Sequence, residues 1–321
     1  MLLFALKRLL YVVPIAFGVS VVCFTLVYLA PGGPEGALIP DNTPPAIAAQ
    51  IREAYGFDKP RPVQYLLWLR RVLTGDFGVS ITTRRPVMSE VMPAMLNTFK
   101  LAGGAIVLAC VAGIALGTLG AYRKGRLSDR FIGAVGIAGI SVPQYWLGMV
   151  LVVLFSVNFG LLPATGMGEA QSGIWNQASH LILPTLALAV VPAGLIARSV
   201  RSTVGEILGQ EFIQTLHANG LPASHVLLHV MKNAAPPALA VIGLEFARLL
   251  GGSILVETVF SWPGTGFLLN SAIFMRDLPV VQGTVLALAM FFVITNVLVD
   301  ILQMLVDPRF KRARALGGAA K

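Results

Sequence analysis

Apolar residues are concentrated in six stretches of this chain, each long enough to cross a membrane. A helix that spans about 30 Å of hydrocarbon requires roughly 20 residues. The stretches are Leu9 to Ala30, Leu101 to Tyr122, Phe131 to about Asn158, Leu181 to Ala197, Pro237 to Val256 and Leu278 to Val299. We therefore predict an all-α, polytopic membrane protein with six transmembrane helices. The first stretch is longer than a signal-peptide core of roughly 7–15 apolar residues, so we expect it to remain as an anchor.

Small residues and prolines inside these stretches predict how the helices pack and bend. Small residues at regular helical spacing let two backbones approach closely in lipid. They are Gly113, Gly117 and Ala121, four apart, and Gly133, Gly136 and Gly139, three apart. Prolines also interrupt the apolar pattern at Pro14, Pro143 and Pro192, and each is expected to kink its helix.

The segment between the first two stretches, residues 31–96, has the pattern of folded structure rather than of a linker. Apolar residues recur at helical spacing around Ala46 to Ile51 and again from Tyr65 to Leu73. Turn residues at Gly56 and at Asp58-Lys59-Pro60 separate the two patterns. The segment is compatible with amphipathic helices lying on the membrane surface or with a platform for an external partner, and the pattern does not choose between them.

Composition and charge support the membrane assignment and orient the chain. Hydrophobic residues make up 56% of the 321 residues, charged residues 12%, and the mean hydropathy is +0.77. Fourteen Lys and Arg residues flank one side of the stretches, whereas the opposite short loops, 159–180 and 257–277, hold only Arg276. Because basic residues in short loops stay in the cytoplasm, both termini are expected there. The net charge of +9 then reports topology rather than nucleic-acid binding.

This topology divides the chain into four parts. Residues 1–30 form the cytoplasmic N-terminus and the first helix, and 31–96 form an external, periplasmic segment. Residues 97–306 form a core of five helices that contains a cytoplasmic loop at 203–237. Residues 307–321 form a basic cytoplasmic tail.

Catalytic and metal-binding patterns are missing from the sequence. It contains no G-x-x-x-x-G-K-[ST] phosphate loop, no H-E-x-x-H and no G-x-S-x-G. His225 and His229 are four apart, but no third ligand lies near them in sequence, and Cys23 and Cys110 lie in apolar runs. We therefore expect no enzyme activity, no cofactor and no metal site.

Residues 210–237 form a polar elbow in an otherwise apolar part of the chain. The spacing of Thr203 and Glu206 predicts a capping box that begins a first helix. Its apolar stripe is Leu208, Phe212 and Leu216, with Ile213 beside them. A turn follows at Asn219-Gly220 and Pro222, where glycine permits a left-handed stop. Ser224 is expected to cap a second helix, and Pro236-Pro237 to end it.

The elbow has three interpretations. A DNA-reading pair of helices is disfavoured, because Glu211 and Lys232 are the only Asp, Glu, Lys or Arg residues from 210 to 237 and phosphate binding requires basic residues. The remaining two are an interfacial hairpin lying on the membrane and a rigid cytoplasmic knob that fits another subunit.

Glu245 and Arg248 are two charges in the middle of the fifth stretch. Three residues apart, they share a helix face and can pair, which offsets the cost of charge in the bilayer, about 2.5–3.5 kcal/mol for each. The pair either fixes packing against a partner subunit, or lines a water-filled pathway and helps to pass the charged ends of a substrate, or lies near the membrane interface.

The elbow resembles the EAA loop of the membrane subunits of ATP-binding-cassette (ABC) importers, and in particular of their dipeptide/oligopeptide branch. The resemblance extends along essentially the whole chain. It includes, in matching order, LAPGGP, GFDKPRPVQYLLWL, GDFGVS, PQYWLG, GLLPATG, HLILPTLALA, VETVFSWPGTG, DLPVVQG and VDPRF. Gly220 corresponds to the glycine of the EAA loop and Pro237 to the proline that ends its second helix. The chain departs from the loop at Gln214-Thr215-Leu216, and it has His217 and Asn219 where relatives often carry basic residues.

The resemblance implies a type I ABC importer permease fold in the plasma (inner) membrane. It also implies the partners: a second homologous permease subunit, two cytoplasmic ATP-binding subunits, an external substrate-binding protein, a peptide substrate and membrane lipid. The residues that it assigns to ATPase coupling are Glu211, Phe212, Gln214, Thr215, Leu216, His217, Gly220, Leu221 and Pro237. Glu245 and Arg248 are the candidates for lining the pathway.

A rival interpretation is an ion- or proton-driven secondary transporter. Such transporters usually have inverted repeats and buried ionisable relays; the sequence has no clear repeat.

Overall fold

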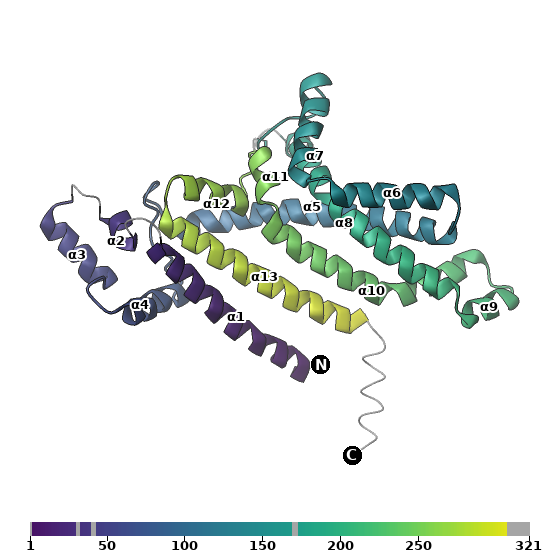
Figure 1. Ribbon diagram of the computed structural model, residues 1–321, viewed down its shortest axis with the longest axis horizontal. Coiled ribbons are helices and arrows are strands. Elements are labelled where there is room, and N and C mark those ends of the chain that lie inside the picture. Colours follow the sequence, from purple (N-terminus) through teal and green to yellow (C-terminus); the bar gives the residue numbers. More distant parts are fainter. Residues whose placement is uncertain (1, 30–32, 40–42, 169–172, 307–321) are drawn as a thin grey trace, which may run out of the picture.

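The computed structural model describes residues 2–29, 33–39, 43–168 and 173–306. Within these ranges the protein is helical, and its long helices run side by side in one bundle (Figure 1). The tail 307–321 lies outside the described residues. The helices are α1 (Leu2–Leu29), α2 (Gly33–Leu38), α3 (Pro45–Tyr55), α4 (Arg61–Leu73), α5 (Val87–Tyr122), α6 (Leu127–Ser141), α7 (Gln144–Leu151), α8 (Ile174–Leu208), α9 (Glu211–Ala218), α10 (Ala223–Gly252), α11 (Ile254–Val259), α12 (Thr265–Phe274) and α13 (Leu278–Val306), and a π-helical segment, η1 (Val152–Asn158), continues α7.

Five helices of the described chain are long and apolar enough to cross a membrane unbroken: α1, α5, α8, α10 and α13. They contain the predicted second, fourth and sixth stretches and the first as far as Leu29, whereas the fifth runs past the end of α10 at Gly252 into α11. The predicted third span is not one straight helix. It breaks at Val142-Pro143 into α6 and the α7–η1 segment, which meet at a bend of 100°. Pro143 cannot donate a backbone hydrogen bond, and the residue before a proline is pushed to extended backbone; Val142 accordingly has φ −84° and ψ 127°.

The packing of α5 against α8 depends on small residues that the sequence singled out. A Cβ added to Gly117 would lie 2.6 Å from the carbonyl oxygen of Ala197, and one added to Gly113 would lie 2.8 Å from Ile196. A Cβ on Gly139 of α6 would lie 2.9 Å from Val190. The prediction of close packing is therefore confirmed at these three glycines. At Gly133 an added Cβ meets no atom within 4 Å, so that glycine is not required for packing within the chain.

The segment that follows α1 forms helices where the pattern predicted them. Gly56 ends α3 with φ 69°, a left-handed conformation that glycine adopts without strain. Helix α4 then packs on α1, where the Tyr65 hydroxyl and the Ser20 hydroxyl lie 2.8 Å apart. The ring of Phe24 lies 5.4 Å from that of Tyr65. Helix α4 is therefore attached to the first span rather than standing free as a separate platform.

Two expectations for the elbow are wrong. Thr203 and Glu206 do not begin a helix, because α8 runs unbroken through them to Leu208. Pro237 does not end one, because α10 continues from Ala223 through Pro236 and Pro237 to Gly252. A proline within a helix costs about 3 kcal/mol. The face of α10 on either side of the prolines packs into the core at Ala234 and Ala238, which keeps the helix continuous.

Candidate functional site

The elbow is a short helix, α9, set between the ends of α8 and α10 at one end of the bundle (Figure 1). The turn after α9 is a Schellman motif, with hydrogen bonds from Gly220 N to His217 O (2.9 Å) and from Leu221 N to Leu216 O (3.2 Å). Gly220 has φ 70°, as the sequence predicted. Leu216 and Leu221 both pack partly against the main core, the hydrophobic contact that accompanies this motif. Helix α10 begins after Pro222 without the predicted Ser224 cap.

Buried side chains anchor the elbow to the bundle. Ile213 of α9 is 2% exposed, and it belongs to the same core cluster as Ile207 of α8 and Val226 and Val230 of α10. Of the other residues in the predicted stripe, Leu208 and Leu216 are half-buried against the same core cluster, and Phe212 is exposed. Ile213 therefore attaches α9 to both α8 and α10.

The outward face of α9 is exposed and mixed in character. Phe212 is 36% exposed, although it is a large apolar residue. The other exposed predicted residues of α9 are Glu211, Gln214, Thr215 and His217; Gly220 is also exposed, and Leu216 and Leu221 are half-buried. Pro237 lies more than three helical turns further along, inside α10 and away from this face.

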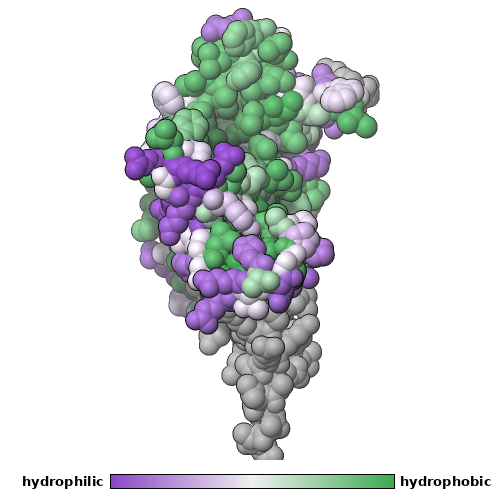
Figure 2. Space-filling model, turned by 90° about the vertical axis from the view of Figure 1, so that its right-hand side faces the viewer, coloured by the Kyte–Doolittle hydropathy of each residue, from purple (hydrophilic) through white to green (hydrophobic). Residues whose placement is uncertain are grey.

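The end of the molecule that carries α9 also displays basic residues. Figure 2 views this end and shows hydrophilic patches below a large hydrophobic upper part. The loop from α5 to α6 and the start of α6 contribute exposed Arg123, Lys124, Arg126 and Arg130. Helices α2 to α4 lie at the opposite end (Figure 1).

Glu245 and Arg248 form the predicted ion pair, with Arg248 Nη1 donating to Glu245 Oε1 at 3.0 Å. Their exposure differs greatly: the Glu245 side chain is 5% exposed and that of Arg248 61%. They lie in the last third of α10, not at its middle, because the helix starts earlier than the apolar pattern suggested. Both line a cavity of about 390 Å³ beside the break between α6 and α7.

Two family models match the sequence. One, described as the binding-protein-dependent transport system inner membrane component, matches residues 113–312. The other, the N-terminal part of such a membrane component, matches residues 1–102. The chain belongs to this family. It is therefore a multi-pass permease subunit of a binding-protein-dependent ABC importer.

Named relatives align with this permease over nearly its whole length. It is 35% identical to the dipeptide transport system permease protein DppB of Alkalihalophilus pseudofirmus, over 97% of this chain and 100% of the relative. It is 36% identical to DppB of Escherichia coli K12, over 98% and 100%. It is 37% identical to the glutathione transport system permease protein GsiC of Salmonella typhimurium, over 97% and 99%.

The fold of the permease also matches a solved structure. An inward-facing structure of the MetNI methionine ABC transporter aligns with a TM-score of 0.56, covering 68% of this chain and 97% of the other. At 19% identity this likeness concerns the fold alone, and it agrees with the expected type I importer permease fold.

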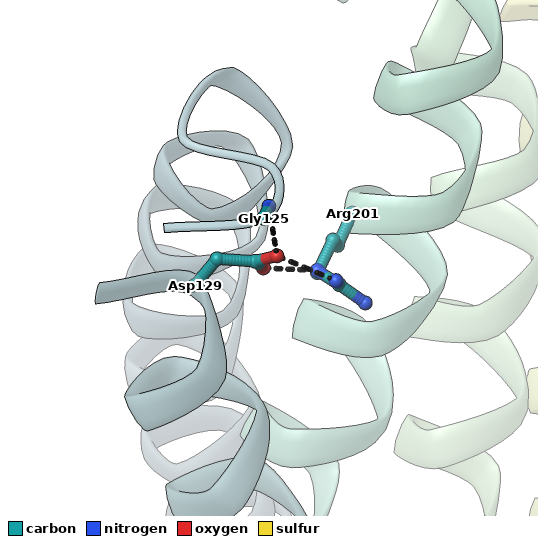
Figure 3. A network of polar contacts seen from close by, with 3 residues as sticks. All are labelled: Gly125, Asp129 and Arg201. Carbon is teal, nitrogen blue, oxygen red and sulfur yellow. Dashed lines mark hydrogen bonds and ion pairs between the residues drawn. The ribbon is translucent and has the colours of Figure 1, made fainter. Parts of the chain in front are cut away.

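Sequence reasoning missed an ion pair near the elbow. Arg201 of α8 was counted only as a topology signal, but its Nε and Nη2 donate to the two carboxylate oxygens of Asp129 at 2.5 and 2.9 Å (Figure 3). Asp129 also accepts a hydrogen bond from Gly125 N at 3.0 Å. The pair joins the first turn of α6 to the helix that leads into α9. Its partners are 72 residues apart, so no local pattern revealed it.

Two buried carboxylates of the permease were missed as well. Glu257 of α11 is 0% exposed and accepts hydrogen bonds from Thr98, Ser253, Gly266 and Phe267. Asp277, just before α13, accepts one from the Ser80 hydroxyl at 2.5 Å and others from backbone N–H groups. Both residues lie in motifs that carry the family resemblance, VETVFSWPGTG and DLPVVQG. Their place in these motifs was the one sequence feature that could have identified them as important.

Proposed function

We propose that this permease imports di- or oligopeptides and that α9 couples it to a separate ATPase subunit. The peptide assignment is supported by the relatives named for dipeptide and glutathione transport, which span the whole chain at 35–37% identity. Peptides differ in their side chains but share a backbone and two charged ends. A permease that transports many peptides would therefore recognise the backbone or these ends.

The observation that carries the coupling role is the combination of exposure and anchoring in α9. Its outer residues are exposed, including the apolar ring of Phe212, while Ile213 on its inner side is buried in the core of the bundle. An exposed aromatic residue on a rigid support is typical of the anchors of protein interfaces. Movement of a docked ATPase would therefore be passed to α8 and α10 as a rigid-body displacement.

The same arrangement supports the proposed partners and orientation. The α9 end displays the exposed basic residues and is assigned to the cytoplasm, where two ATP-binding subunits would dock on two permease subunits. The opposite end, with α2 to α4, is assigned to the external side, where the substrate-binding protein would deliver the peptide. On this assignment the four parts of the chain keep the predicted order, except that α5 begins at Val87 within the predicted external segment.

Transport energised by ATP is the direct test. A tagged form of the chain is purified with its partner chains, reconstituted into liposomes, and supplied with the loaded binding protein outside and ATP inside. Uptake of labelled dialanine is expected to require ATP and to persist when ionophores abolish all ion gradients. Uptake that follows an imposed ion gradient and ignores ATP would instead identify a secondary transporter.

A further inference from the structure

The break in the third span opens a cavity at the Glu245–Arg248 pair. The cavity has a volume of about 390 Å³, within the usual range of small-molecule sites, roughly 300–1,000 Å³. Four helices meet around it: the end of α6, the start of α7, α8 near Pro192 and the last turns of α10. Helix α7 runs across the direction of the long helices (Figure 1), at 100° to α6. The cavity therefore exists because the apolar span is discontinuous.

The two charged residues that line this cavity, Glu245 and Arg248, differ in exposure. The Glu245 side chain is almost completely buried and its Oε1 is bonded to Arg248, whereas 61% of the Arg248 side chain is exposed. A guanidinium has five N–H donors, and the bond to Glu245 uses Nη1. The positively charged guanidinium of Arg248 is therefore exposed at the cavity, whereas the carboxylate of Glu245 that balances its charge is buried.

The backbone at the break between α6 and α7 does not cancel the positive charge of Arg248 at the cavity. Ile140, Ser141 and Val142 at the C-terminal end of α6 line the cavity, as do Pro143 and Gln144 at the N-terminal end of α7. The partial charges of a helix C-terminus and a helix N-terminus are opposite, so the two ends largely offset each other. Gln144 Nε2 is directed to Leu188 O at 3.2 Å, which leaves Arg248 as the charged donor facing the cavity.

We propose that Arg248 binds the C-terminal carboxylate of the peptide as it passes this cavity. The proposal rests on the proposed peptide substrate and specifies which charged end is recognised here. Arginine binds carboxylates through two parallel hydrogen bonds, and every unmodified peptide carries this group whatever its side chains. Glu245 is a positioning residue: it neutralises the pair in the membrane and holds the guanidinium at the cavity. Among the described residues that line the cavity, the one carboxylate is that of Glu245, and it is buried, so the amino end of the peptide has no comparable partner in this part of the chain.

The test compares two variants that differ only in the guanidinium. Arg248→Gln alone would leave Glu245 buried and unpaired, which is strongly destabilising. Glu245→Gln is therefore compared with the double variant Glu245→Gln, Arg248→Gln, and a third variant, Glu245→Gln with Arg248→Lys, restores the positive charge. Each complex is reconstituted with its partner chains, and assembly and basal ATPase rate are measured first. Uptake of dialanine and of dialanine amide is then measured at concentrations that saturate the binding protein.

Glu245→Gln keeps an amide oxygen that can accept the hydrogen bond from Arg248, so this variant is expected to retain a preference for dialanine over its amide, weaker than that of the wild type. Compared with Glu245→Gln, the double variant is expected to lower the ratio of dialanine uptake to dialanine amide uptake about tenfold, the effect of one charge-assisted hydrogen bond. The lysine variant is expected to recover part of the loss. An equal ratio in Glu245→Gln and the double variant would overturn the carboxylate site while leaving peptide transport intact. If the wild-type complex imports neither peptide with ATP, the proposed function itself is wrong, and this site with it.

Discussion

Arg201 of α8 binds both carboxylate oxygens of Asp129 at the start of α6, at 2.5 and 2.9 Å (Figure 3). The contact fixes the first half of the broken span to the helix that leads into the elbow. Asp129 is buried and Arg201 half-buried. Movement of α9 is therefore expected to reach α6, and through α6 the cavity at its far end.

The first prediction concerns this contact. Arg201→Lys keeps the charge but cannot make two parallel hydrogen bonds, so it is expected to lower both the melting temperature of the complex and the peptide imported per ATP hydrolysed. Arg198→Lys, at an exposed position on the same helix, is the matched control and should change neither. If both variants keep wild-type coupling, the ion pair is not part of the transmission path.

The second prediction concerns the turn at Gly220. Its φ of 70° is costly for a residue with a Cβ, by about 1–2 kcal/mol, although an added Cβ would meet no atom within 4 Å. Gly220→Val should therefore reorient α9 and reduce co-purification of the ATPase while the amount of membrane-inserted protein stays close to wild type. Gly205→Ala, in a helical position with equal space, should have no such effect. A general loss of the Gly220→Val protein would instead indicate that the turn serves folding.

The third prediction concerns Phe212 as a docking residue. Phe212→Ala removes the exposed ring from α9 and is expected to weaken ATPase binding about tenfold, measured by titrating the purified ATPase onto the permease in detergent. Leu127→Ala is the control, because Leu127 is 81% exposed and begins α6 near the same end of the bundle. Equal affinities for the two variants would remove Phe212 from the docking surface.

The fourth prediction concerns topology. Cys23 and Cys110 are first changed to alanine, and a single cysteine then replaces either Thr43 or Gly317. The two single cysteines should react with an impermeant maleimide from opposite sides of the membrane. The Thr43 position should react in intact cells, and the Gly317 position, which lies outside the described residues, only after lysis. Labelling of both from the same side would contradict the assigned orientation.

The fifth prediction concerns pH and Asp277. Burial raises the pKa of this carboxyl, but hydrogen bonds from the Ser80 hydroxyl and from backbone N–H groups outweigh burial, so its pKa lies below the ordinary value. A depressed pKa stabilises the folded state above the unfolded pKa of about 3.9, and this stabilisation is lost as the pH falls through the folded pKa. Asp277→Asn should therefore melt below wild type at pH 7, and the difference should shrink below about pH 4. A difference independent of pH would mean that the carboxylate charge contributes nothing.

The sequence was most informative where one side chain or a short repeat controls local conformation. The turn at Gly220 followed from the need for a left-handed residue between two helical patterns, and a turn at Gly56 was predicted from its position between two such patterns. Gly113 and Gly117 were identified from their spacing alone. The same local reasoning failed at Thr203 and at Pro237, because a capping pattern and a proline act only if the chain around them is free to leave the helix. There, burial in the core keeps it helical.

By itself the sequence determined the number and order of apolar stretches, the charge asymmetry between the two sides and the position of the elbow, because hydrophobicity and backbone restriction act over a few neighbouring residues. Only the tertiary structure decided which charges pair and where the cavity lies. Asp129 meets Arg201, Thr98 meets Glu257 and Ser80 meets Asp277 across 72, 159 and 197 residues, and such contacts leave no trace in local periodicity. The unequal exposure of Glu245 and Arg248 likewise depends on four helices meeting around the break at Pro143, since burial is a property of the packed bundle and not of the residues alone.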